Sequence, residues 1–300
     1  MASNVQRASI SVPEFAQRYE KFLKELTIKD YSHRTVVTYS SHLGATCLYF
    51  GKLPEYLNAD DIRDYLHHLI VKNPSSSRSM FEHTVAALRC YYKTFGYTTP
   101  YMALPSIPKR KKLPVVLSYD EMLSLLKVSK TVRSKAILGM LYSCGLRVSE
   151  VCNMEIRDVN SGRMLVHIRQ SKGNKDRYVP LAENMLPVLR AYYKKHKPQQ
   201  YLFNAHGLSG KKMHPSEVSH ILGTARILSG MTRQITCHTL RHTFASHLLE
   251  MGVDIFKVQR LLGHANIQTT LVYLHVVFPD AENGKYFSPL DVLLSPKEKK

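Results

Sequence analysis

The sequence lacks the features that mark a membrane, secreted or disulfide-linked protein. It has no apolar run of about 18 residues, so no membrane span is expected. Its first fifteen residues, MASNVQRASISVPEF, lack the apolar core of a signal peptide, which favours a cytoplasmic protein. The cysteines are few, odd in number and without a CxxC pair: Cys47, Cys90, Cys144, Cys152 and Cys237. They predict reduced, packed thiols and neither a disulfide framework nor a zinc site.

Acidic residues are also scarce. The chain carries 23 Asp plus Glu against 42 Lys plus Arg, a formal net charge of +19 with a pI near 9.7. Such an excess favours a polyanionic partner, nucleic acid first. Ribosomal and membrane-surface proteins share this charge, but no basic amphipathic helix with a wide apolar face is present, which disfavours the membrane. The charge therefore defines a class of partner and leaves the activity open.

The length and the composition predict two domains. Three hundred residues with 44% hydrophobic and 22% charged residues suffice for two cores. Neither a repeat nor a low-complexity segment interrupts them. Four stretches of helical periodicity predict an N-terminal bundle, the first of them opened by Ser11 and Pro13 as cap and first-turn residues. We expect an N-terminal tail, the bundle, a linker, a second domain and a C-terminal segment over residues 1–10, 11–97, 98–114, 115–279 and 280–300.

The predicted linker combines prolines with a basic cluster. Four prolines in seventeen residues are expected to break any helix or strand there. Its cations are Lys109, Arg110, Lys111 and Lys112. Either the segment is a solvated spacer, or it lies extended along a phosphate backbone; the two readings are compatible.

The second domain is predicted to be mainly helical with one small sheet. Ser118 and Glu121 form a capping box that begins a helix, and a further helix ends near Gly145. Residues 156–181 alternate β-branched and polar residues around two turn signals, which predicts about three antiparallel strands. Every later segment has a helical pattern. The expected fold class is thus mainly α, with a helical bundle followed by a mixed domain.

Four segments of this domain carry candidate functional residues. Arg147 and Glu150 stand three apart at a helix start, and Lys172 stands at the tip of a hairpin. His238 and Arg241 also share a helix face, opposite an apolar stripe, and are expected to point away from the core. His242 and His247 lie off that line and are interpreted as structural or surface residues. Each segment alone is compatible with ordinary packing, pairing or solvation.

The last segment, LLGHANIQTTLVYLH, places His264 and Tyr273 nine residues apart. Taken alone, Tyr273 reads as a packing residue. Together with the other segments it completes a set suited to transferring a phosphodiester to tyrosine without a metal. Guanidinium groups can bind phosphate oxygens bidentately, a phenol needs activation to attack, and the leaving 5′-hydroxyl needs an acid. The sequence shows no acidic metal cluster, and no metal or cofactor is expected.

The blocks GLRVSE, SKGNKDRYVPL, HTLRHTFASHLL, LLGH and TTLVYLH, in this order, resemble the tyrosine recombinase (phage-integrase-like) family, in particular its Xer-type members. The resemblance covers the whole second domain, and the helical first domain fits the family's core-binding domain. It implies that Arg147 and Arg241 clamp the phosphate and that His264 hydrogen-bonds it. Ser171 stands where glycine is frequent in the family.

The remaining roles follow from the same resemblance. His238 is implied as a base near the nucleophile, Lys172 as the general acid and Tyr273 as the nucleophile that forms a 3′-phosphotyrosyl bond. Glu150 is implied as a supporting residue. Further contacts to double-stranded DNA are expected from the linker cluster and from Lys175 and Arg177.

The resemblance also implies an assembly. Exchange between two recombination sites requires four protomers, either identical or shared with a related recombinase, on nucleoid DNA. The apolar stretch 287–295 suits passage of a C-terminal segment to a neighbour, although packing on its own domain is the simpler alternative. Three other functions stay open: a recombinase or transposase of a mobile element, a type IB topoisomerase, and a non-catalytic DNA-binding protein.

Overall fold

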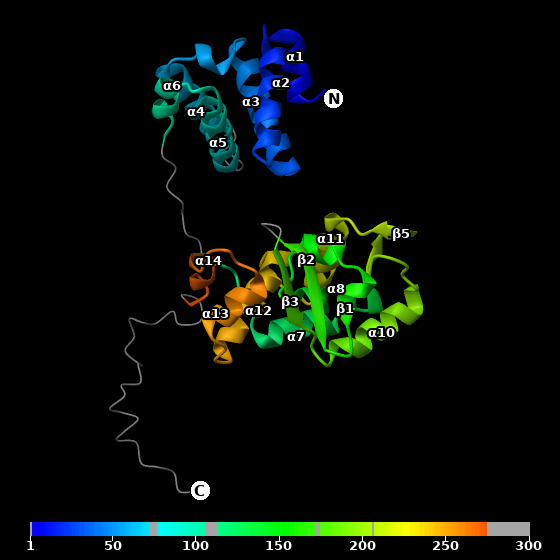
Figure 1. Cartoon of the computed structure of the whole chain (residues 1–300). Helices are drawn as coiled ribbons and strands as arrows, with labels where there is room; N and C mark the ends of the chain where they lie inside the picture. The colour runs from blue at the N-terminus through cyan, green and yellow to red at the C-terminus, as the bar shows by residue number, and fades with distance from the viewer. Residues whose placement is uncertain (1, 73–76, 106–112, 172–174, 206, 275–300) are drawn as a thin grey trace, which may run out of the picture. The chain divides into compact units, whose positions relative to one another are not determined.

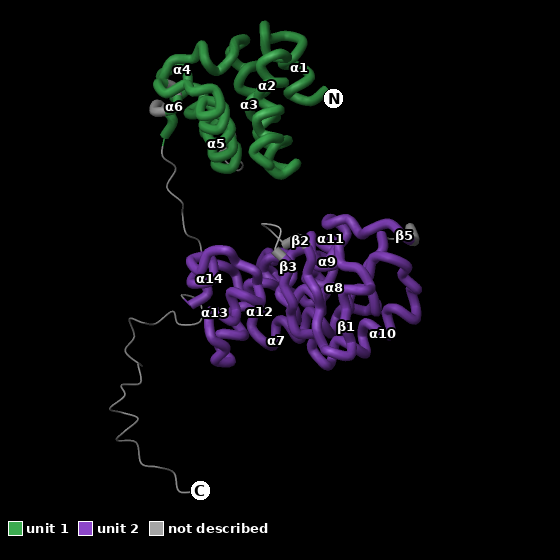
Figure 2. The backbone as a smooth tube through the Cα atoms, viewed as in Figure 1, with its two compact units in different colours: residues 1–110 green, residues 111–300 purple. Residues whose placement is uncertain are grey.

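The computed structural model describes residues 2–72, 77–105, 113–171, 175–205 and 207–274 (Figure 1). The chain divides into two compact units, residues 1–110 and 111–300 (Figure 2). The division falls inside the predicted linker. Lys109, Arg110, Lys111, Lys112, Lys172 and the C-terminal segment 280–300 lie outside the described residues, so the functions expected of them stay predictions.

Unit 1 is helical. Its elements are α1 (Asn4–Ser11), α2 (Phe15–Ile28), α3 (His33–Phe50), the 3₁₀ turn η1 (Pro54–Tyr56), α4 (Ala59–Lys72), α5 (Ser77–Phe95) and α6 (Thr98–Ala103). The limits of α3 follow from its end residues. The Ser32 side chain accepts from the Thr35 N–H at its start, and Gly51 at its end adopts φ +66°, a conformation that suits glycine.

Three expectations for unit 1 are wrong. Residues 4–11 form helix α1 and not a tail: Ser3 and Gln6 make a capping box, Ala8 is buried, and the Asn4 side chain donates to the Ser41 carbonyl of α3. Gly44 of α3 permits this close approach, since a Cβ there would lie 3.0 Å from the Asn4 backbone. The tertiary contact adds to the local capping box and holds this short helix against α3.

The other two differences concern helix limits. Ser11 ends α1, and the next helix begins at Phe15. Helix α6 lies within the segment expected to break helices. Its proline, Pro100, stands in the first turn, where a missing N–H costs no intrahelical hydrogen bond.

Unit 2 combines helices with two small antiparallel sheets. Its helices are α7 (Tyr119–Lys127), α8 (Val132–Ser143), α9 (Val148–Asn153), η2 (Ile156–Asp158), α10 (Met185–His196), α11 (Pro215–Leu228), α12 (Cys237–Glu250), α13 (Ile255–Leu262) and α14 (Gln268–Leu271). The predicted sheet is confirmed, with the order β1 (Val159–Asn160), β2 (Leu165–Ser171), β3 (Lys175–Pro180). A second pair, β4 (Asn204–Ala205) with β5 (Leu208–Lys212), corrects the expectation of helices only after the first sheet.

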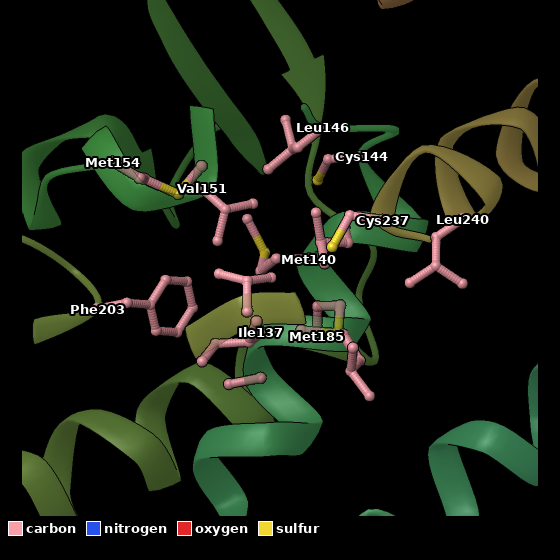
Figure 3. Close-up of a cluster of buried hydrophobic side chains, with 14 of the residues drawn as sticks. Ile137, Met140, Cys144, Leu146, Val151, Met154, Met185, Phe203, Cys237 and Leu240 are labelled. Carbon is pink, nitrogen blue, oxygen red and sulfur yellow. The ribbon is translucent and has the colours of Figure 1, made fainter. Parts of the chain in front are cut away.

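The core of unit 2 surrounds α8. Residues Ala136 to Leu141 are fully buried, so this helix is covered on all sides. Side chains from α9, α10 and α12 meet it, among them Val151, Met185 and Leu240 (Figure 3). A smaller cluster joins α12 to α13 and to the segment after α14, and it includes Phe244, Val258 and Tyr273. This second cluster sets the nucleophile candidate against α12. Within the described residues, no helix has the length and apolar character needed to cross a bilayer.

Candidate active site

Arg147 and Glu150 pair at the start of α9, as their spacing predicts. Arg147 is the N-cap residue, and its backbone N–H donates to Glu150 Oε2 at 2.8 Å. Its guanidinium Nη1 donates to Glu150 Oε1, also at 2.8 Å. The acid therefore holds both the main chain and the side chain of the arginine, which fixes the direction of the guanidinium.

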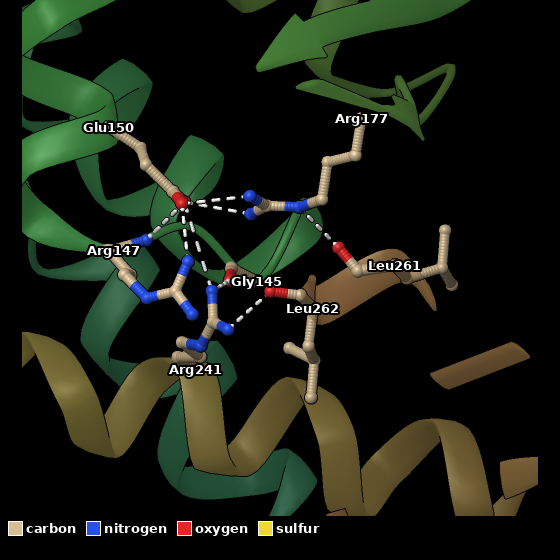
Figure 4. A network of polar contacts seen from close by, with 7 residues as sticks. All are labelled: Gly145, Arg147, Glu150, Arg177, Arg241, Leu261 and Leu262. Carbon is tan, nitrogen blue, oxygen red and sulfur yellow. Dashed lines mark hydrogen bonds and ion pairs between the residues drawn. The ribbon is translucent and has the colours of Figure 1, made fainter. Parts of the chain in front are cut away.

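Arg177 corrects the prediction of a DNA contact. Its side chain is 8% exposed and forms a bidentate ion pair with Glu150, with Nη1 and Nη2 both at 2.8 Å from carboxylate oxygens. Its Nε donates to the Leu261 carbonyl at 2.7 Å (Figure 4). The physical reason is strand alternation: Arg177 pairs with the buried Ile168 and shares the inner face with buried Val179. We interpret Arg177 as a brace between β3, α9 and the end of α13.

Among the described residues, Arg241 is the largest fully buried side chain, with 1% of its surface exposed. Its Nη1 donates to the Gly145 carbonyl at 2.8 Å and its Nη2 to the Leu262 carbonyl at 2.5 Å. Nη1 also lies 3.8 Å from Glu150 Oε2 (Figure 4). The expectation that His238 and Arg241 both point outward is therefore right for His238, which is exposed, and wrong for Arg241. Burial is tolerated because backbone carbonyls and a carboxylate receive the charged group.

The charges at this point shift several pKa values. Burial by itself would raise the pKa of Glu150, but the hydrogen bonds and charge of Arg177, with those of Arg147 and Arg241, lower it to about 2. Burial lowers the pKa of Arg241 to about 10, and the charge of Arg147 acts in the same direction. At neutral pH the described cluster thus sets three guanidinium groups around one carboxylate, and it presents excess positive charge.

Tyr273 is buried, with 3% of its surface exposed, and lies in the field of this cluster. Burial raises the pKa of its phenol, while the charges of Arg241 and Arg147 act to lower it. Its hydroxyl lies 3.0 Å from Nδ1 of His242. The interpretation of His242 as a structural or surface residue did not anticipate this contact with the nucleophile candidate. The available signal was its spacing: His242 stands four residues after His238 and so shares its helix face.

The other histidine assigned a structural role, His247, has one. It is buried, with Nδ1 at 2.8 Å from the Tyr142 hydroxyl and Nε2 at 2.9 Å from the Leu117 carbonyl. The ring of Tyr119 stacks on it, with centroids 3.8 Å apart. These contacts hold α12 against Leu117 and Tyr119, near the start of unit 2.

His264 follows α13 in a tight turn at Gly263, which has φ +64°. Its Nδ1 lies 2.9 Å from Oγ1 of the fully buried Thr270, so one threonine of the intervening stretch sets the ring direction. Burial first, and then the charges of Arg241 and Arg147, lower the pKa of His264 to about 3. The imidazole is therefore neutral at pH 7 and can donate one hydrogen bond to an anion.

The structure brings five of the six predicted catalytic residues into one region. Arg147, His238 and Arg241 interact electrostatically, and the ring of Tyr273 lies 6.3 Å from that of His264. Lys172, the sixth, lies outside the described residues, as does the side chain of Lys175. Across the part of the chain that the structure describes, no group of three or more His, Cys, Asp or Glu side chains could hold a metal ion. The cations that the structure describes at this site are arginines and not metal ions.

Comparison with known proteins supplies the family. The model of the "Phage integrase family" matches residues 116–279, and that of the "Phage integrase, N-terminal SAM-like domain" matches residues 19–99. The tyrosine recombinase XerA of Pyrococcus horikoshii is 36% identical over 263 residues, 86% of this chain and 88% of that protein. A "Putative integrase/recombinase y4qK" of Sinorhizobium fredii is 34% identical over 259 residues, covering 86% and 83%.

Two solved structures agree with these matches. A crystal structure of XerA recombinase has 27% identity and a TM-score of 0.52, and covers 91% of this chain and 99% of that one. A lambda integrase dimer bound to a COC′ core site has 19% identity and a TM-score of 0.68 over 91% and 79%, and shows the shared fold. The chain thus belongs to the phage integrase family and is a Xer-type tyrosine recombinase, an enzyme of site-specific DNA recombination.

Proposed function

We propose that the enzyme cleaves and rejoins DNA at specific sites through a covalent 3′-phosphotyrosyl intermediate on Tyr273, with neither metal nor ATP. One observation carries the proposal: the Tyr273 phenol lies in the field of Arg241 and Arg147, beside a neutral imidazole at 3.0 Å. A phosphodiester that enters this field meets two guanidiniums and the His264 ring. These groups stabilise charge on the non-bridging oxygens, the part that a metal plays elsewhere.

The proposed reaction is a balanced exchange of bonds. The Tyr273 oxygen gives its proton to a neighbouring imidazole, attacks phosphorus and forms the O–P bond as the bond from phosphorus to the 5′-oxygen breaks. Lys172 gives a proton to the leaving 5′-oxygen. Because one phosphate ester replaces another, a 5′-hydroxyl from a second strand can reverse the step without an external energy source. Arg147 and Arg241 hold the phosphate, and Glu150 holds the arginines.

Two duplexes have four strands to exchange, and each protomer supplies one Tyr273, so we propose four protomers on two sites. Solved relatives in this fold include a lambda integrase tetramer bound to a Holliday junction. The net charge of +19 supports the DNA partner. The linker cations and Lys175 are proposed to contact its backbone, where their effect would be salt-dependent and independent of sequence.

The test uses nicked duplexes that carry randomised sites, incubated with the purified protein in EDTA. Nicking lets the short 5′-product diffuse away, so that covalent complexes accumulate and resist SDS. We expect a 3′-linked adduct with the wild type and none with Tyr273→Phe at unchanged DNA binding. An adduct that persists in Tyr273→Phe, or one that appears only with added magnesium, would contradict the proposal. Sequencing the trapped DNA then defines the site.

A further inference from the structure

The hydrogen bond that the structure describes for the Tyr273 hydroxyl goes to His242 and not to His238. Nδ1 of His242 lies 3.0 Å from the phenol oxygen, with the two ring centroids 5.5 Å apart. His238, the residue whose motif implies a base, contacts His242 edge-on, with centroids 4.7 Å apart and the planes at 80°. The three rings form a row that runs from the buried phenol through His242 to the exposed His238.

The position of His242 is fixed by the elements around it. Arg241, the preceding residue, is anchored on two backbone carbonyls, and the following residue, Thr243, accepts from the Leu117 N–H at 3.0 Å. Both neighbours are buried, so α12 cannot rotate without breaking these contacts. The imidazole is thus held at hydrogen-bonding distance from the nucleophile before any substrate arrives, as a general base requires.

We propose that His242 accepts the phenolic proton of Tyr273 at Nδ1 as the O–P bond forms, and returns it when the strand is rejoined. The inference rests on the proposed function and names the base of its first step. The balance is simple: the O–H bond breaks, Nδ1 gains the proton, and the imidazolium keeps its Nε2 proton until religation or passes it outward past His238. The 5′-oxygen receives its proton separately, from Lys172.

The surrounding charges suit this role. The titratable and charged groups near the ring are His238 and Arg241 of its own helix and Tyr273, and next to that phenol lie His264 and Arg147. Burial, with the effect of His238 and Arg241, lowers the pKa of His242 to about 4, so the ring is neutral and able to accept at pH 7. A bound phosphate offsets the charge of Arg241. It thereby raises the basicity of His242, so DNA itself strengthens the base.

The experiment compares single-turnover cleavage of nicked DNA with an oxygen or a sulfur at the 5′-bridging position of the scissile phosphate. A thiolate leaves without a proton, so sulfur bypasses the acid but not the base. His242→Leu removes the acceptor, and His242→Asn keeps an acceptor near Nδ1 that cannot titrate. We expect about 100-fold slower cleavage for His242→Leu on both substrates, and a smaller loss for His242→Asn. Lys172→Ala should be slow on oxygen and restored on sulfur.

The pH profile adds a readout that a structural role would not move. The wild-type rate should level off with rising pH, whereas the His242→Asn rate should keep rising toward the pKa of the phenol. Cleavage by His242→Leu within twofold of wild type overturns the inference. The inference is also overturned if His238→Asn slows cleavage of both the oxygen and the sulfur substrate more than either His242 variant does. That result would assign the base role to His238.

A second measurement separates this inference from the proposed function. The ¹⁵N NMR signal of His242 Nδ1 should shift in Tyr273→Phe, because the variant removes its hydrogen-bond partner. An unchanged signal overturns the contact whether or not the protein cleaves DNA. If the wild-type protein forms no covalent DNA adduct, the proposed function is contradicted, and the NMR signal still tests the contact between His242 and Tyr273.

Discussion

Unit 2 contains two arginine–carboxylate clusters that lie on the same scaffold and differ in charge balance. Around Glu150, the described residues set three guanidinium groups, those of Arg147, Arg177 and Arg241, about one carboxylate. In the other cluster two acids, Glu155 and Asp158, face two arginines. Positive charge that no carboxylate of the protein compensates is available to an anionic substrate. By this difference in charge, the Glu150 cluster is suited to bind an anion and the other cluster to a structural role.

The second cluster is the balanced one. Arg169 bridges both acids, at 3.0 Å from Glu155 and 2.9 Å from Asp158, and Arg157 pairs with Glu155 at 2.6 Å. Its arginines are also more exposed, at 73% and 30%, while the three arginines around Glu150 are 20%, 8% and 1% exposed. Exposed pairs contribute little to stability, and a neutral cluster attracts no phosphate. The comparison predicts different effects of the same substitution in the two places.

The largest effect is expected for Arg241→Lys. A lysine cannot reach two backbone carbonyls and present a planar pair of donors to phosphate, so cleavage of nicked DNA should fall about 100- to 1,000-fold. Arg169→Lys is the matched control and should cleave within twofold of wild type. Equal losses in the two variants would remove the distinction between the clusters. Thermal melts of both variants check that each is folded.

Glu150→Gln should have the next largest effect, on folding. Loss of this carboxylate leaves buried guanidiniums uncompensated, and breaking such a pair costs about 3 kcal/mol of unfolding free energy. Urea denaturation measures the change. Glu155→Gln should shift the midpoint less, because the partner arginines of Glu155 are more exposed and remain accessible to water. A larger shift of the midpoint for Glu155→Gln than for Glu150→Gln would show that Glu150 does not contribute more to stability.

The stability of unit 2 should decrease in acid in two overlapping steps. In the folded chain the pKa values of His242 and His264 are lowered to about 4 and about 3. Below pH 6.5 the unfolded chain therefore binds more protons than the folded chain, and stability falls as the pH falls. Glu150 has a folded pKa lowered to about 2, so its contribution is full above 4.5 and is lost as the pH falls toward 2. Urea midpoints at several pH values test this, and His242→Asn should flatten the first step. A midpoint that rises between pH 6.5 and 4 would contradict the assignment.

The smallest effect on chemistry is expected for Arg177→Lys. One lysine cannot keep both the bidentate pair with Glu150 and the bond to the Leu261 carbonyl, so Arg147 and the turn before His264 lose a shared support. We expect about tenfold slower cleavage with unchanged DNA affinity, since a small misplacement of catalytic groups is enough. A loss of affinity at unchanged cleavage would instead restore Arg177 as a DNA contact.

The sequence predicted those parts of the site that depend on local spacing. The three-residue interval between Arg147 and Glu150, the capping box at Ser118 and the end of α8 near Gly145 all concern neighbours within one turn. The burial of Arg241 could not be predicted in this way, because its acceptors lie 96 and 21 residues away. Helix α1 was missed in spite of its local capping box at Ser3 and Gln6, and its packing against Gly44 of α3 could not be predicted from local spacing.

Two features of the site could have been predicted from the sequence pattern alone. Arg177 alternates with exposed Asp176 and Tyr178 and lies in phase with buried Val179, which predicts an inward side chain. His242 stands one helical turn after His238. Arg177 was assigned to the DNA surface by its type, although its strand periodicity placed it inside, and for His242 the available signal was the helix face that it shares with His238.

The anchoring of Arg241 on main-chain oxygens has a consequence for how this site can fail. No substitution deletes a carbonyl, so the acceptors themselves are beyond the reach of point mutation. A point mutation can instead disrupt the backbone turn that orients each carbonyl toward Arg241. Gly145, with φ +58°, has the Phe244 ring where a Cβ would stand, and at Gly263, beside Leu262, a Cβ would lie 3.0 Å from the Arg177 side chain. A screen for inactive variants should therefore recover substitutions of Gly145 and Gly263 as often as substitutions of Arg241, although neither glycine takes part in the reaction.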